Sequence, residues 1–126
     1  MKVIEGLYYS KEHEWVKVVD GKAYVGITKY AADSLGDVVF VELPEVDDEF
    51  EKNDVLGVIE SVKAASDMFT PISGTVIEVN ENLEDEPQLI NADPYENHIV
   101  VLKMHDETEL EDLMNSEEYK QFCENI

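Results

Sequence analysis

Positively charged residues are scarce in this chain. Nine Lys and Arg residues face thirty Asp and Glu residues, which gives a net charge of −21 over 126 residues. So acidic a surface repels phosphate backbones and anionic lipids, and we therefore expect neither nucleic-acid nor membrane binding. The same field favours docking on the basic faces of partner proteins, with an association that weakens as salt rises.

Cysteine occurs only once, at Cys123, which excludes an intrachain disulfide and is consistent with a reducing compartment. Cys123 shares a helical stripe with Tyr119 and Phe122, so we expect a packed thiol rather than a nucleophile. Long apolar runs are also absent, and residues 1–5 lack the hydrophobic core of a signal peptide. We expect a cytoplasmic protein, or a mitochondrial matrix protein if the chain is the processed form of a eukaryotic precursor.

The common signatures of catalysis are missing as well. The sequence contains no Gly-x-Ser-x-Gly elbow and no glycine-rich phosphate loop. No pair among His13, His98, His105 and Cys123 has a recognised zinc-ligand spacing. We therefore expect neither a metal centre nor a nucleophilic enzyme.

One constellation still allows acid–base chemistry, namely His13-Glu14-Trp15. In an extended segment His13 and Glu14 would lie on alternate faces, and Trp15 would pack against the core. An acid–base enzyme built on these residues remains an alternative, and it would need an activity that survives the removal of Lys63.

Strand patterns dominate the rest of the chain, whose length suits one domain over residues 1–126. Short runs rich in β-branched residues, separated by turn residues, predict an all-β sandwich or barrel with strands at 16–19, 22–27, 38–43, 55–60, 75–80 and 99–104. Thr28 and Gly36 are typical of the two ends of a helix over 29–35. Thr108 and Glu111 predict a capping box for a helix through Met114, and a further helical turn begins at Ser116. We expect these helices to cover sheet edges.

Lys63 is the most informative residue. It lies in the polar and small-residue stretch 60–67, between two strand-like segments, and therefore near the tip of a hairpin. Ala64 and Ala65 leave the approach to its ε-amine open. The pattern predicts a displayed amine.

This stretch resembles the modification site of lipoyl and biotinyl carrier domains, where a cofactor is attached to a hairpin lysine through an amide. Biotin carriers have Met on both sides of that lysine, whereas Val62 and Ala64 stand here, which favours lipoate. Glu60 and Ser66-Asp67 resemble the glycine cleavage H proteins in particular. Further segments resemble the same family in register, at 11–16, 25–28, 35–44, 71–74, 76–80 and 86–91.

The resemblance implies a lipoyl-carrier β sandwich, or flattened hybrid barrel, with a short internal helix and C-terminal helices. It implies lipoate covalently attached to Lys63, with Glu60, Ser61, Val62 and Ala64 framing the attachment site. The chain would be a non-catalytic, monomeric carrier. It would shuttle the aminomethyl group of glycine from a pyridoxal-phosphate glycine decarboxylase (P protein) to a tetrahydrofolate-dependent aminomethyltransferase (T protein).

Two further partners follow from the resemblance: dihydrolipoyl dehydrogenase (L protein), and a lipoate ligase or lipoyltransferase. In this family the loaded arm folds into a surface cleft, and Glu14 and Asp67 match the acidic residues that hold it. Ser34 stands where many members carry His. Residues 95–99 also differ, because the family commonly has Gly and then Trp before its last strand, whereas Ile99 stands here.

Two other functions remain open at this point. The chain could act mainly as a lipoyl relay that donates lipoate to 2-oxoacid dehydrogenase complexes. It could also be an acidic scaffold whose hairpin lysine is never modified. Intact mass after expression with lipoate separates the scaffold from both carriers.

Overall fold

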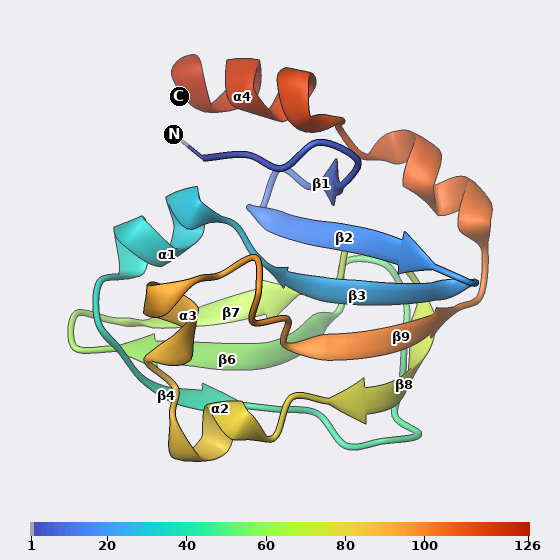
Figure 1. Ribbon diagram of the computed structural model, residues 1–126. Coiled ribbons are helices and arrows are strands. Elements are labelled where there is room, and N and C mark those ends of the chain that lie inside the picture. Colours follow the sequence, from blue (N-terminus) through green and yellow to red (C-terminus); the bar gives the residue numbers. More distant parts are fainter. Residues whose placement is uncertain (1) are drawn as a thin grey trace.

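The computed structural model describes residues 2–126, and its strands form two antiparallel sheets (Figure 1). The larger sheet has the strand order β1-β2-β3-β9-β8-β5, and the smaller sheet has the order β4-β6-β7. The strands are β1 (Tyr8–Tyr9), β2 (Glu14–Val19), β3 (Lys22–Ile27), β4 (Val38–Glu42), β5 (Glu49–Phe50), β6 (Val55–Ser61), β7 (Ala65–Phe69), β8 (Gly74–Val79) and β9 (Val100–Met104). The predicted all-β sandwich is confirmed.

The main core lies between the two sheets. Val25 and Val100, from neighbouring strands of the larger sheet, are fully buried, and Val41 and Ile59 from the smaller sheet belong to the same cluster. Alternation along each strand places these β-branched side chains on the inner face. Burial of this kind supplies most of the free energy that favours folding.

The last strand, β9, is held in register by its pairing with β3. Val100 pairs with Val25 of β3, and the Ile99 amide donates to the Val25 carbonyl at 2.8 Å. Ile99 itself is buried just before β9 and belongs to the main core.

The helix α1 (Lys29–Leu35) has the predicted bounds. The Thr28 side chain accepts a hydrogen bond from the Ala31 amide, and Gly36 ends the helix with a positive φ of 77°. Two additional one-turn helices, α2 (Asn82–Asp85) and α3 (Leu89–Ala92), bury Leu83 and Ile90 at the edge of the core. These helices, and the two-residue strands β1 and β5, were not predicted, whereas β7 is the second strand of the predicted lysine hairpin.

The first C-terminal helix differs from the prediction, whereas the second begins at Ser116 as predicted. A 3₁₀ helix, η1 (Glu107–Asp112), replaces the expected α-helix through Met114. Its cap is Asp106, whose carboxylate accepts both the amide and the hydroxyl of Thr108, so the Thr108 side chain is not free to cap. The helix α4 (Ser116–Glu124) follows, with a capping box formed by Asn115 and Glu118.

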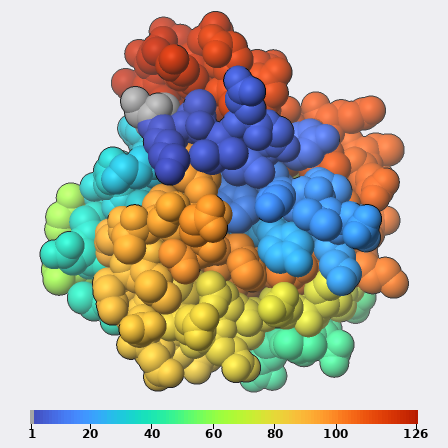
Figure 2. All heavy atoms as spheres, viewed as in Figure 1, coloured from blue at the N-terminus to red at the C-terminus, as the bar shows by residue number. Residues whose placement is uncertain are grey.

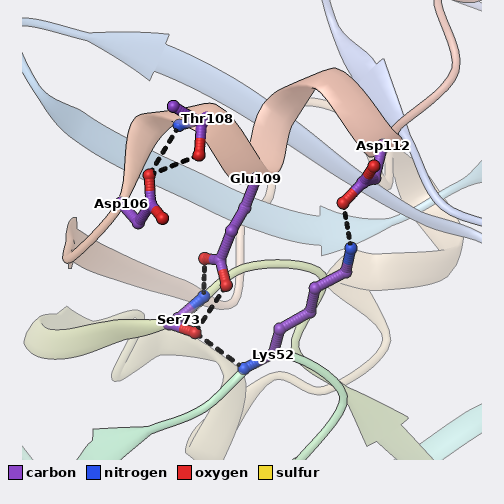
Figure 3. Close-up of polar contacts among 6 residues, drawn as sticks. All are labelled: Lys52, Ser73, Asp106, Thr108, Glu109 and Asp112. Carbon is purple, nitrogen blue, oxygen red and sulfur yellow. Dashed lines mark hydrogen bonds and ion pairs between the residues drawn. The ribbon is translucent and has the colours of Figure 1, made fainter.

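The 3₁₀ helix is fastened to the loops beside the sandwich (Figure 3). The Glu109 carboxylate accepts the amide and the hydroxyl of Ser73 at 2.7 and 2.8 Å, and Ser73 Oγ accepts the Lys52 amide at 2.9 Å. Lys52 also pairs with Asp112 at 2.8 Å. These contacts fix the path of the chain from β9 to α4.

The helix α4 lies across the N-terminal segment, as both views of the molecule show (Figures 1 and 2). Tyr119 of α4 is fully buried and stacks on Tyr9 of β1, with ring centroids 4.6 Å apart. Trp15, Leu7, Phe122 and Cys123 belong to the same cluster, which confirms the predicted packing of the thiol. None of the helices within residues 2–126 is long and apolar enough to cross a membrane.

Candidate functional site

Lys63 lies exposed in the tight turn between β6 and β7, as predicted. Ser61 shapes this turn, because its hydroxyl oxygen accepts the amides of Lys63 and Ala64 at 3.1 and 3.2 Å. The Ser61 amide donates in turn to the Ala64 carbonyl at 2.8 Å. Val62 and Ala64, on either side of the lysine, are exposed. Glu60 and Ala65 form the last residue pair of the two strands before the turn.

The end of α1 supports the hairpin tip from one side. The Val62 amide donates to the Asp37 carbonyl at 3.0 Å, so the tip is joined to the segment between α1 and β4. The Lys63 stem passes over Gly36, and a Cβ atom built there would lie 3.6 Å from Lys63 Cδ. Gly36 has φ 77° and ψ −157°, a combination that is essentially restricted to glycine.

A cleft of about 490 Å³ opens beside the hairpin, between α1, the start of β2 and β7. Glu14, Ser34 and Asp67 all line it, although they come from three different elements. Ala65 and Ser66 line it too, so the cleft begins close to Lys63. A larger hollow of about 610 Å³ beside β8 and α2 includes no residue of the hairpin.

Glu14 is the most unusual residue of the cleft, because it is an acidic residue with an exposed fraction of only 2%. The Ser10 hydroxyl donates to Glu14 Oε1 at 2.6 Å. Burial raises the pKa of Glu14 from 4.5 to about 7, since desolvation disfavours the charged form more than the Ser10 hydrogen bond favours it. Near neutral pH this carboxyl is therefore divided between its acid and carboxylate forms.

His13 lies in the same cleft as Glu14, and not on the opposite face of a strand as the sequence predicted. The reason is the backbone of His13, which has a positive φ of 67° and lies just outside β2, so that the alternation of side chains is broken. The His13 ring stacks on Tyr30 of α1, with centroids 4.4 Å apart. Burial lowers the pKa of His13, although the nearby Glu12 charge opposes this effect.

A hydrogen-bonded chain connects the cleft wall to the C-terminal helix. His13 Nδ1 lies 2.8 Å from the Tyr119 hydroxyl, which lies 2.7 Å from Thr28 Oγ1. Tyr119 thus links α4 both to the cap of α1 and to a residue that lines the cleft. Sequence reasoning identified Tyr119 only as a packing residue, because no local pattern indicates partners about ninety or a hundred positions away.

The family is shown by comparison with known proteins. The model of the glycine cleavage H-protein family matches residues 7–126. Proteins named glycine cleavage system H protein from Thermoanaerobacter pseudethanolicus and from Clostridium botulinum are 56% and 52% identical to this chain. The alignments cover 98% and 100% of this chain, and 98% and 97% of the relatives. This chain therefore belongs to the glycine cleavage H-protein family.

A solved structure agrees with this conclusion. The crystal structure of a glycine cleavage system H protein from Mycobacterium marinum superposes with a TM-score of 0.88 at 33% identity. The match covers 97% of this chain and 99% of the other. The two-sheet fold is therefore the lipoyl-carrier fold that the sequence resemblance implied.

Proposed function

We propose that this chain is the lipoyl carrier of a glycine cleavage system, with lipoate joined to Lys63 Nζ by an amide. The observation that carries the proposal is the exposed Lys63 on a hydrogen-bonded turn, two residues before the first hairpin residue that lines the cleft, in a chain of this family. Lipoate supplies a disulfide on a long arm, which can accept and release the aminomethyl group of glycine. The protein supplies covalent tethering, which raises the effective concentration of that arm at each partner.

The residues around the lysine suit a tethered arm. The exposed Lys63 amine stands on a turn held by Ser61, and the small side chain of Ala64 leaves its approach open. The neighbouring cleft has an apolar wall that includes Ile27, Ile59 and Phe69, against which a hydrocarbon arm can lie.

We propose that Glu14, Asp67 and Ser34 hold the loaded arm. The cargo carries a cationic nitrogen, and the Glu14 carboxylate offers it an ion pair in a partly desolvated site. Asp67 is exposed and serves as a second acceptor, and the Ser34 hydroxyl oxygen can accept a hydrogen bond from the same nitrogen. Holding the nitrogen in the cleft shields the cargo from water until the next enzyme withdraws it.

The partners follow from this role. The glycine decarboxylase loads the arm, the aminomethyltransferase unloads it, dihydrolipoyl dehydrogenase reoxidises it, and a lipoate ligase or lipoyltransferase attaches it. The carrier contributes no catalytic group of its own. A role mainly as a lipoyl relay is not favoured, because the relatives named above bear the glycine cleavage name.

The test is Lys63→Arg, because a guanidinium cannot form the lipoyl amide and keeps its positive charge. Intact mass after incubation with lipoate ligase, ATP and lipoate should show one added lipoyl group on the wild type and none on the variant. Lys17→Arg, on the exposed Lys17 of β2, is the matched control and should be modified like the wild type. Lipoylation of Lys63→Arg, or glycine cleavage supported by it, would overturn the proposal.

A further inference from the structure

Strand β4 exposes two consecutive apolar side chains. Val39 is 53% exposed and Phe40 is 49% exposed, whereas Val38 and Val41 on either side are buried. A regular strand would turn Phe40 to the same face as Val38. Here the register of β4 against β6 shifts between Val38 and Phe40, so a β-bulge turns both side chains outward. Such bulges commonly re-aim a side chain next to a functional site.

These side chains lie beside the lysine hairpin. Val38 pairs with Ser61 and Phe40 pairs with Glu60, and the amide of Val62 donates to Asp37 just before β4. Val62 is itself 68% exposed. Figure 1 shows the chain from α1 to β4 on the same side of the molecule as the tip of the β6–β7 hairpin. We refer to Val39, Phe40 and Val62 as the tip patch.

The tip patch is separate from the cleft and has an acidic surround. None of its three residues lines the cleft. The exposed side chains of Asp37 and Glu42 and the half-buried Glu60 neighbour it along β4 and β6. Apolar residues surrounded by charged ones are typical of a protein-binding site, and the charges here call for a basic partner.

We propose that the tip patch is the docking surface for the enzyme that attaches lipoate to Lys63, and that this enzyme presents an apolar pocket surrounded by Lys or Arg. This inference rests on the proposed function. The attaching enzyme must bring the unmodified Lys63 amine into its own active site, and the lysine stem is short, so it must contact the protein at the tip. Enzymes that act on the far end of the long lipoyl arm can dock farther away.

The test uses the full-length unmodified chain with purified lipoate ligase, ATP and lipoate. In the double variant Val39→Thr/Phe40→Thr, threonine retains β propensity while the apolar contact is lost. We expect the KM for the protein substrate to rise roughly tenfold, with kcat little changed. Thermal unfolding should show that the variant is folded. Val55→Thr is the matched control, because Val55 is 46% exposed at the opposite end of β6, and it should behave like the wild type.

The outcomes separate this inference from the proposed function. If the wild type is lipoylated and the double variant has the same KM, the docking surface is wrong while the carrier role stands. An equal rise of the KM in Val55→Thr would also overturn the docking surface, because the effect would not depend on proximity to Lys63. If the wild type is not lipoylated at all, the proposed function itself fails. Reoxidation of the fully lipoylated, reduced double variant by dihydrolipoyl dehydrogenase should match the wild type, and a tenfold loss there would refute the assignment to the attaching enzyme.

Discussion

A glutamate side chain in water loses its proton near pH 4, whereas Glu14 retains its proton up to a pKa of about 7. The cause is burial, which outweighs the opposing effect of the hydrogen bond from Ser10. Because the folded state binds this proton more tightly than the unfolded chain, ionisation of Glu14 opposes folding. The protein therefore keeps a carboxyl group whose charge is costly until a cation pairs with it.

We predict that Glu14→Gln stabilises the protein at alkaline pH. The contribution of Glu14 to the free energy of unfolding is constant below about pH 4.5, falls as the pH rises towards 7, and levels off above that value. The rise in pKa from 4.5 to about 7 corresponds to roughly 3 kcal/mol. Gln retains the acceptor for Ser10, so urea unfolding should show a gain over the wild type that is small at pH 4 and largest at pH 8.

The same variant tests how the arm is held. At pH 8 the wild-type carboxylate is mostly charged, so Glu14→Gln should still be loaded but should lose the aminomethyl group severalfold faster when no partner is present. Glu12→Gln is the control, because it removes one charge from an exposed neighbour that also lines the cleft. It should change the free energy of unfolding and the rate of aminomethyl loss much less. Identical loss rates for the wild type and Glu14→Gln would limit Glu14 to a structural role.

Between elements, the Tyr119 hydroxyl is the polar contact that joins α4 to the cleft wall. It lies within hydrogen-bond distance of His13 and of Thr28, and its ring stacks on Tyr9. Burial raises the pKa of Tyr119 well above its usual range, so the hydroxyl remains protonated at any physiological pH. The C-terminal helix therefore helps to orient a residue of the cleft that lies at the other end of the chain.

We predict that Tyr119→Phe destabilises the protein by about 1–3 kcal/mol, because it removes a buried hydroxyl with two partners while keeping the stacked ring. Urea unfolding measures this loss, and amide hydrogen exchange should show faster opening of α4 than in the wild type. Tyr8→Phe, in the neighbouring strand β1, is the control and should cost much less. Equal stability of both variants would show that the hydroxyl does not fasten α4.

Across the whole molecule, acidic side chains greatly outnumber their possible partners. Nine basic residues face thirty acidic ones, and within residues 2–126 the lysine–carboxylate pairs are Lys29–Asp33 and Lys52–Asp112. Most of the negative charge is therefore free to act at a distance. Such a field accelerates encounters with basic surfaces, and salt screens it.

We predict that association with the aminomethyltransferase slows at least tenfold between 20 mM and 500 mM salt, mainly through the on-rate. Stopped-flow measurements of binding give the on-rate and the off-rate separately, and the off-rate should change much less. The lipoate-attaching enzyme should show the same trend. A flat on-rate across this range would remove the steering role of the acidic surface.

Local chemistry explains which elements could be predicted. Alternating β-branched runs located β3, β4, β6, β8 and β9 to within one residue at each end, and β2 starts two residues earlier than expected. Thr28 and Gly36 marked the ends of α1. The two-residue strands β1 and β5 and the one-turn helices α2 and α3 are too short for any periodicity to develop. At the 3₁₀ helix, Asp106 and Thr108 are both good N-cap residues, and the local sequence does not distinguish them. In the structure Asp106 is the cap, because its carboxylate accepts the Thr108 amide.

The strongly acidic charge follows from composition alone. The positions of most strands and of Lys63 in a hairpin turn were predictable because each depends on residues close together in the chain. The burial of Glu14, its position beside Ser34 and Asp67 in one cleft, and the contact between His13 and Tyr119 became visible only in the folded chain. The bulge that exposes Phe40 belongs to the same group. These features depend on how separate elements pack, and packing sets both the distance between remote side chains and the dielectric around a carboxyl group.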